Sequence, residues 1–150
     1  MPTNRPERKI IRLPNYDYSS EGAYFVTLCT EGKAKILCNY TLPKMEGDAP
    51  EFFLTPVGRV VDELIRLIPG IDKYVIMPNH IHMMILNSAQ DYPLPRKLQY
   101  FKSNVTRKLG RSIWQRSYYE YVIRGERDYQ TRWKYIDDNP AKWATDDYYC

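Results

Sequence analysis

Residues 71–86 read IDKYVIMPNHIHMMIL, and this stretch decides the fold. β-Branched and other apolar side chains dominate residues 71–77 and 80–86, as is typical of strands. Pro78 and Asn79 between them favour a tight turn. The stretch therefore predicts a hairpin of two antiparallel strands, with two histidines in its second strand.

Further strands and helices are predicted on both sides of the hairpin. Apolar β-formers predict strands at 24–30 and 118–123 and short β-like pieces around 36–38 and 52–54. Apolar residues at helical spacing, bounded by proline and glycine, predict helices at about 56–68, 96–109 and 126–139. This order matches an α+β fold, the ferredoxin-like βαββαβ sandwich with two helices on one face of an antiparallel sheet. An extra C-terminal helix follows it.

The length of 150 residues predicts a single domain over the whole chain, with a basic irregular arm at about 1–20 and a loose tail at about 141–150. Cys29, Cys38 and Cys150 are odd in number and scattered, which argues against a disulfide framework and favours a reducing cytoplasm. No apolar run approaches roughly 18 residues, and the start lacks the apolar core of a signal peptide. We therefore expect a cytoplasmic protein that neither spans a membrane nor is secreted.

Positive charge is concentrated in two parts of the chain. Residues 96–132 hold ten Lys or Arg against three acids, and residues 1–12 hold four against one, whereas the whole chain has a net charge of +4. Such an excess attracts phosphate backbones. Aromatic side chains that could stack on unpaired bases are interleaved with it: Tyr100, Phe101, Trp114, Tyr118, Tyr119 and Tyr121. A solvated basic helix face with core-filling aromatics would give the same composition.

The sequence has two histidines, and both lie in the hairpin, as His80 and His82. A spacing of two in a strand places them on one face, with Ile81 and Met83 on the other, toward the helices. Two neutral imidazoles side by side could bind one divalent metal, although two surface histidines are the alternative. Because two ligands do not complete a site, and no Cys-x-x-Cys pair is present, the third ligand must be an oxygen or an amide.

The last predicted helix offers such a ligand. Its apolar stripe is Tyr129, Trp133 and Ile136. Tyr135 and Asn139 lie one turn apart and roughly 100° from the centre of that stripe, so a hydroxyl and an amide would be presented side by side. The alternative is a boundary tyrosine followed by an asparagine that ends a helix before a proline.

The segment Pro78-Asn79-His80-Ile81-His82 resembles the HUH motif of the single-tyrosine transposases of insertion sequences. The resemblance is closest to their relatives, the REP-associated tyrosine transposases. Further segments that carry it span roughly residues 10–148 in order: Leu13–Tyr18, Tyr24–Thr27, Phe101–Ser103, Trp114–Arg116, Tyr118–Glu120, Ile123-Arg124 and Tyr135–Pro140.

This resemblance implies a metal-dependent DNA transposase or nickase. Tyr135 would be the catalytic nucleophile, and His80, His82 and Asn139 would hold Mg²⁺ or Mn²⁺. The enzyme would cleave and rejoin single-stranded DNA near hairpins through a 5′-phosphotyrosine intermediate, without ATP. Two positions depart from relatives: Asn139, where insertion-sequence members have glutamine, and Tyr121, where histidine is common. Insertion-sequence relatives act as dimers and the REP-associated group as monomers, so both states are open.

The expected partner is single-stranded or hairpin DNA. Lys102 could neutralise a phosphate or be an ordinary solvated lysine, and Trp114 could stack a base or pack at the core. The candidate DNA-binding residues are Lys102, Arg107, Lys108, Trp114, Arg116 and Arg124. Two other functions stay open: a non-catalytic nucleic-acid-binding module on the same fold, and a metal phosphoesterase in which the histidines assist water.

Overall fold

The computed structural model describes residues 22–41, 45, 50–88 and 90–145. The predicted arm at about 1–20, Cys150 and the end of the predicted tail lie outside these residues. The elements, in chain order, are β1 (Gly22–Cys29), η2 (Glu31–Lys33), β2 (Cys38–Thr41), β3 (Glu51–Leu54), α1 (Pro56–Ile65), β4 (Ile71–Met77), β5 (His80–Asn87), α2 (Leu94–Leu109), β6 (Tyr119–Ile123), α3 (Glu126–Asp138) and η3 (Pro140–Thr145).

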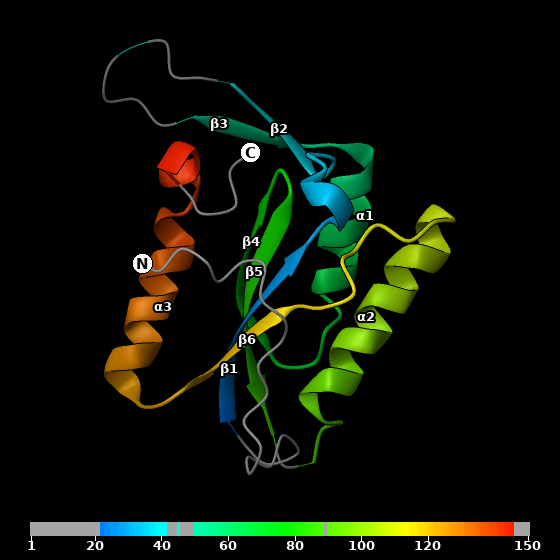
Figure 1. Ribbon diagram of the computed structural model, residues 1–150. Coiled ribbons are helices and arrows are strands. Elements are labelled where there is room, and N and C mark those ends of the chain that lie inside the picture. Colours follow the sequence, from blue (N-terminus) through cyan, green and yellow to red (C-terminus); the bar gives the residue numbers. More distant parts are fainter. Residues whose placement is uncertain (1–21, 42–44, 46–49, 89, 146–150) are drawn as a thin grey trace.

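Four strands form an antiparallel sheet in the order β4-β5-β1-β6 (Figure 1). The histidine strand β5 is therefore central, between β4 and β1. Its register with β1 pairs His82 with Thr27 and His80 with Cys29. Strands β2 and β3 form a separate two-stranded sheet.

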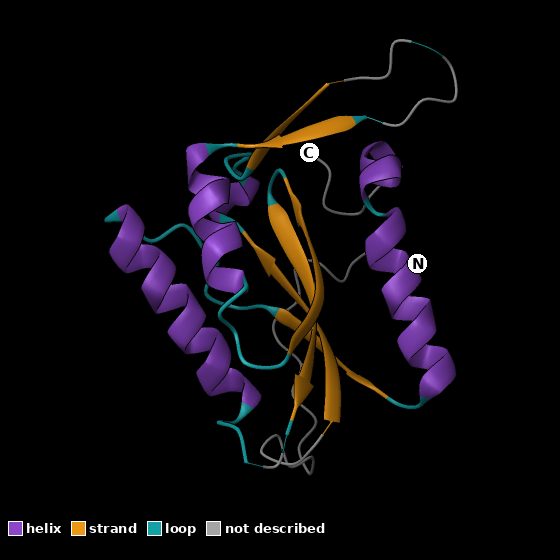
Figure 2. Ribbon diagram, turned by 180° about the vertical axis from the view of Figure 1, so that it is seen from behind, coloured by secondary structure: helices purple, strands orange, loops and turns teal. Residues whose placement is uncertain are grey.

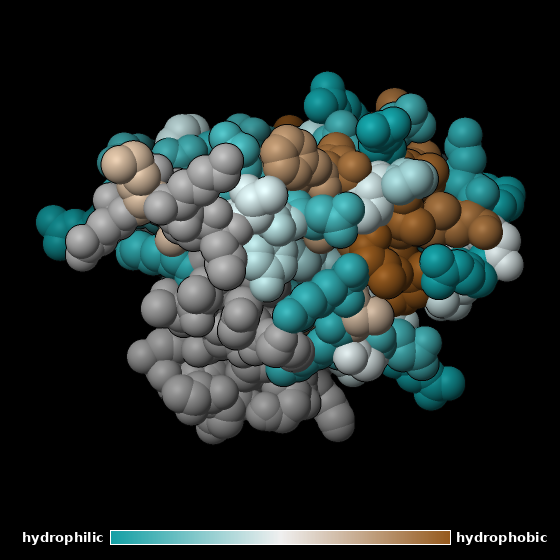
Figure 3. Space-filling model, turned by 90° about the horizontal axis from the view of Figure 1, so that it is seen from above, coloured by the Kyte–Doolittle hydropathy of each residue, from teal (hydrophilic) through white to brown (hydrophobic). Residues whose placement is uncertain are grey.

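Helices cover both faces of the sheet. Figures 1 and 2 show α1 and α2 on one face and α3 on the other. The larger core lies under α1 and α2 and includes Ile81, Met83 and Ile85, as the alternation in the hairpin predicts. A smaller core lies under α3 and contains Phe25, Met84, Ile123 and Ile136. Seen from the end that carries β2 and β3, apolar side chains gather on the α1–α2 side (Figure 3).

The boundaries of the helices follow from local chemistry. The Thr55 hydroxyl accepts a hydrogen bond from the Gly58 amide (3.0 Å), so it caps α1. Glycine is required at position 58 because a Cβ there would lie 1.9 Å from the Leu37 carbonyl oxygen. At the end of α2, Gly110 adopts a φ of +78°, a left-handed conformation that favours glycine. Among the described residues, none of the helices is both long and apolar enough to cross a bilayer.

The prediction of an α+β fold with an antiparallel sheet and three helices is confirmed, but two details are wrong. Helix α1 ends at Ile65 instead of continuing to residue 68. The buried stripe of α3 is not Tyr129, Trp133 and Ile136, because Trp133 is 41% exposed. The ammonium of Lys73 lies over the Trp133 ring, 3.6 Å from its centroid, and holds it at the surface. The buried face instead includes Ile136 and Asn139, with Tyr135 half-buried beside them.

Candidate active site

The turn between β4 and β5 is fixed by the loop that follows β1. Met77 pairs with His80, so the turn consists of Pro78 and Asn79. The Asn79 carbonyl accepts hydrogen bonds from the Thr30 amide (3.0 Å) and the Thr30 hydroxyl (3.1 Å). These bonds hold the start of β5 in a defined position.

The two histidine rings lie side by side and are buried. Their exposed fractions are 0% and 1%, and their centroids are 4.7 Å apart. The alternative of two surface histidines is therefore wrong. Nδ1 of His82 lies 2.8 Å from the Thr27 hydroxyl, and Nδ1 of His80 lies 2.8 Å from Oδ1 of Asn79. Because Nδ1 of each ring has this hydrogen bond, Nε2 is the nitrogen through which either ring would bind a metal.

Tyr135 reaches the histidine pair from α3. Its ring centroid lies 5.3 Å from that of His82 and 5.8 Å from that of Phe25, in edge-on contact with both. Phe25 stacks on His82 at 5.3 Å. The predicted nucleophile and the histidine pair therefore meet within one chain.

Asn139 follows Tyr135 by one turn and is 3% exposed. Its Oδ1 atom is buried and makes no hydrogen bond among the described residues. An orphaned buried carbonyl oxygen is costly unless it has a partner, and a cation would satisfy it. Over all the residues that the structure describes, no group of three or more His, Cys, Asp or Glu side chains could hold a metal ion. A third ligand for the histidine pair would therefore have to be of another residue type, and the buried Asn139 amide oxygen is of a suitable chemical kind.

Several contacts hold α3 on the sheet. Lys73 of β4 pairs with Asp137 (3.3 Å), and the Tyr129 hydroxyl donates a hydrogen bond to the Asp72 carboxylate, which raises the pKa of Tyr129 to about 12. The Arg132 guanidinium lies 3.9 Å from the Tyr121 ring centroid. The sequence alone does not predict these positioning contacts or the roles of Thr27 and Phe25. In each case the two partners lie on different elements, and no local pattern marks them.

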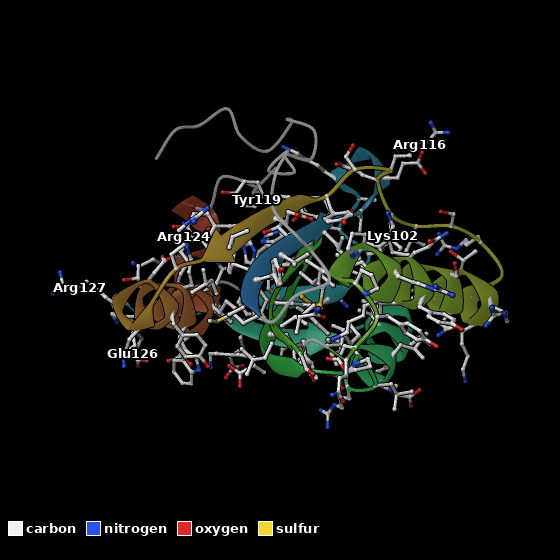
Figure 4. All side chains as sticks on the ribbon, turned by 90° about the horizontal axis from the view of Figure 1, so that it is seen from below. Lys102, Arg116, Tyr119, Arg124, Glu126 and Arg127 are labelled. Atoms are coloured by element: carbon white, nitrogen blue, oxygen red, sulfur yellow. The ribbon has the colours of Figure 1, made fainter. Side chains whose placement is uncertain are left out.

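The predicted DNA-binding residues do not all lie together. Lys102, Arg107, Trp114 and Arg116 line one cleft beside α2, with a volume of about 630 Å³. Lys108 and Arg124 do not line it. Figure 4 shows Lys102 and Arg116 on one side of the molecule and Arg124 beside α3 on the other.

Lys102 and Trp114 have structural contacts that bear on their predicted roles. The Lys102 ammonium donates hydrogen bonds to the carbonyls of Gln115 (3.0 Å) and Arg116 (3.3 Å), and burial lowers its pKa. Trp114 is 5% exposed and packs against Phe101, with 5.9 Å between the ring centroids. The geometry favours the packing role for Trp114 over the stacking of a base.

Comparison with known proteins relates the chain to transposases, although no family model matches it. An uncharacterized protein of Haemophilus influenzae is 32% identical over 174 aligned positions, which cover 95% of this chain and 93% of that protein. A putative REP-associated tyrosine transposase of the same organism is 29% identical over 82 residues, and a REP-associated tyrosine transposase of Escherichia coli is 30% identical over 73. The two transposase matches cover 45% and 48% of this chain, and only 47% and 44% of those relatives.

Solved structures agree on the fold. A REP-associated tyrosine transposase bound to a REP hairpin has a TM-score of 0.62 and 21% identity, covering 88% of this chain and 74% of that one. A putative transposase of Deinococcus radiodurans has a TM-score of 0.50 and 16% identity, covering 87% of this chain and 98% of that one. The partial matches in sequence and the shared fold both relate this chain to proteins named as transposases. Over about half of its length the chain is similar to REP-associated tyrosine transposases, and it shares the fold of one of them.

Proposed function

We propose that this protein cleaves and rejoins single-stranded DNA near hairpins by transesterification, with Tyr135 as the nucleophile. The observation that carries the proposal is the contact between the Tyr135 and His82 rings, 5.3 Å apart, beside a buried histidine pair. The strand order β4-β5-β1-β6, with α1 and α2 on one face, supports a ferredoxin-like sheet with α3 as the helix that carries the nucleophile.

The reaction exchanges one phosphodiester for another. The Tyr135 oxygen attacks the scissile phosphorus, a new P–O bond forms to the tyrosine, and the bond to the 3′ oxygen breaks. The phenolic proton leaves the tyrosine, and the 3′ oxygen ends as a hydroxyl. Because the phosphotyrosine keeps the energy of the diester bond, attack by a 3′ hydroxyl can rejoin DNA without ATP.

The metal ligands in this proposal are Nε2 of His80, Nε2 of His82 and Oδ1 of Asn139. A bound Mg²⁺ or Mn²⁺ would polarise the scissile phosphate and stabilise the departing oxygen. Thr27 and Asn79 orient the two rings through their hydrogen bonds to Nδ1. The edge-on contacts of Tyr135 with Phe25 and His82 limit the positions that its ring can adopt.

DNA is the proposed partner for two reasons. A solved structure of similar fold is that of a transposase bound to a REP hairpin. The excess of Lys and Arg over residues 96–132 would attract the phosphates of such a substrate. Binding through these charges weakens steeply with salt, because each neutralised phosphate releases counterions.

A non-catalytic binding module on the same fold is the competing function, and substitution of the histidines separates the two. We expect His80→Ala and His82→Ala to abolish cleavage of labelled single-stranded DNA in Mg²⁺ or Mn²⁺, while hairpin binding and the circular dichroism spectrum stay close to wild type. His82→Gln, which keeps more of the buried volume, serves as a second variant. Cleavage at the wild-type rate by either alanine variant in metal-depleted buffer would refute the proposal, and wild-type protein that binds but never cleaves would favour the module.

A further inference from the structure

The Phe25 ring is the place where helix α3 meets the histidine strand. It stacks on the His82 ring, with 5.3 Å between the centroids, and contacts the Tyr135 ring edge-on at 5.8 Å. The Arg132 guanidinium lies over the same phenyl ring, 5.2 Å from its centroid. We propose that Arg132 is a positioning residue, which holds Tyr135 against His82. This inference rests on the proposed function in one respect, namely that Tyr135 is the nucleophile.

Arg132 and Tyr135 lie one turn apart on α3. Residues three apart on a helix are neighbours on its surface, and both of these side chains contact Phe25. The helix thus meets the Phe25 ring at two points along its axis. Two such contacts limit the rotation of α3 more than one does, so they help to set the direction in which the Tyr135 side chain leaves the helix.

A second aromatic ring completes the contact of the guanidinium. Arg132 lies 3.9 Å from the centroid of the Tyr121 ring. Phe25 and Tyr121 are opposite each other in the register of β1 with β6, and both pack in the core under α3. Aromatic faces attract a guanidinium, and the attraction is stronger where water is excluded. The Arg132 side chain is 27% exposed, so this contact is largely shielded from water.

The two rings, and not an ion pair, account for the position of this guanidinium. Oδ1 of Asp128 lies 3.9 Å from Nε of Arg132, which is too far for a hydrogen bond. Oδ2 of Asp128 accepts a hydrogen bond of 2.9 Å from the Arg124 amide instead. Nε of Arg132 is buried and makes no hydrogen bond among the described residues. Lysine would not make the same contact, because its ammonium has no flat face to lie along a ring.

The Arg132 contacts complement those that β4 makes with the same helix. Asp72 and Lys73 of β4 contact Tyr129 and Asp137 of α3. Arg132 contacts rings on β1 and β6 instead. Because β4 and β6 are the two edges of the sheet, the two sets of contacts lie on either side of the histidine strand β5. Without Arg132, α3 would keep the contacts with β4 but could turn about them.

The position of Tyr135 relative to His82 can be measured directly, because the sequence has only two histidines. The His82 ring lies beside the rings of Phe25 and Tyr135, so the ring currents of both affect its proton chemical shifts. In NMR spectra of protein with isotope-labelled histidine, His82→Gln assigns the two imidazoles. Tyr135→Leu, which removes the neighbouring ring, shows where the His82 signals lie when Tyr135 is absent. The spectra are recorded at one fixed pH, without metal or DNA.

We expect Arg132→Met to move the His82 signals toward those of Tyr135→Leu, and Arg132→Lys to do the same. At saturating DNA, Arg132→Met should form the covalent adduct about tenfold more slowly or worse, because a small displacement of a nucleophile is costly. The matched control is Arg127→Met, since Arg127 is an exposed arginine of the same helix and points away from the sheet (Figure 4). It should leave both the signals and the rate unchanged.

Substitution of Tyr121 tests the same contact without a change in α3. Tyr121→Leu removes one of the two rings that the guanidinium contacts, so it should shift the His82 signals in the same direction as Arg132→Met. Tyr121→Phe keeps a ring at this position and should match wild type. Should Arg132→Met fail to fold, as judged by circular dichroism, the two Tyr121 variants decide the question.

His82 signals that are the same in Arg132→Met and Arg127→Met would overturn the proposal, and so would equal rates of adduct formation in these two variants. Weaker hairpin binding by Arg132→Met with unchanged His82 signals would mean that the guanidinium contacts DNA and does not position Tyr135. Should wild type form no adduct, the proposed chemistry fails, but the His82 signals still decide whether Arg132 places Tyr135.

Discussion

Each buried imidazole in β5 has a defined hydrogen-bond partner at Nδ1. For His82 that partner is the Thr27 hydroxyl at 2.8 Å, from the neighbouring strand β1. The Thr27 side chain is 2% exposed, so water does not readily replace it. The hydroxyl therefore fixes the orientation of the ring and the nitrogen that it presents to a ligand.

Replacing Thr27 with valine keeps the shape of the side chain and removes this hydrogen bond. Loss of such an outer partner of a metal-binding histidine typically costs about 10- to 100-fold in metal affinity or activity. We expect Thr27→Val to cleave single-stranded DNA at least about tenfold more slowly at limiting Mn²⁺ and to bind hairpin DNA normally. Thr41→Val, on exposed residue 41 of β2, is the control. Equal cleavage rates for the two variants would show that Thr27 does not orient His82.

Helix α3 depends on a few contacts with one edge of the sheet. Its core is small, and β4 supplies the Asp72 carboxylate and the Lys73 ammonium that hold Tyr129, Trp133 and Asp137. These contacts lie on both sides of Tyr135 along the helix and therefore help to set its position. The stability of this helix therefore bears directly on the proposed chemistry.

The Tyr129 contact should give a pH-dependent contribution to stability. Its pKa, ordinarily about 10, is raised to about 12 by the Asp72 carboxylate. Because the raised value belongs to the folded state, the stabilisation is complete below about pH 10 and is lost as the pH rises through about 12. Tyr129→Phe should therefore lower the urea midpoint at pH 8 and differ less from wild type near pH 11.

The control is Tyr100→Phe, because Tyr100 is 54% exposed. This substitution should leave the midpoint unchanged at both pH values. If the urea midpoints of wild type and Tyr129→Phe differ by the same amount at pH 8 and near pH 11, the Tyr129 hydroxyl makes no pH-dependent contribution to stability.

Local sequence patterns predict most of the elements but not how α3 packs. The apolar strand residues and the Pro78-Asn79 turn are sufficient to predict the hairpin of β4 and β5, because both strands and their turn are adjacent in the chain. The spacing of apolar residues in α3 predicted the wrong buried face. It counts Trp133 as an apolar core residue, whereas Lys73 holds the Trp133 ring at the surface. That lysine lies on a strand far away in the chain. The contacts of Thr27 and Phe25 likewise depend on the register of β1 with β5.

At the scale of the whole molecule, the sheet separates two surfaces. The histidines and Tyr135 lie on the α3 face, and the basic cleft lies on the α2 side. Tyr135 contacts His82 within one chain, so the proposed nucleophile and the histidine pair need no second copy in order to meet. The histidine pair, Tyr135 and Asn139 could be picked out from the sequence. That four of the six predicted DNA-binding residues line one cleft could not.

The central claim is that Tyr135 becomes covalently joined to DNA. The most direct test is to incubate the protein with labelled single-stranded DNA and Mg²⁺ or Mn²⁺, isolate any covalent adduct on a denaturing gel, and map the modified peptide by mass spectrometry. We predict a 5′-phosphotyrosine at Tyr135, no adduct with Tyr135→Phe, and a normal adduct with Tyr121→Phe, the matched change on the same face. An adduct that persists in Tyr135→Phe, or that maps to another tyrosine in the wild type, would contradict the claim.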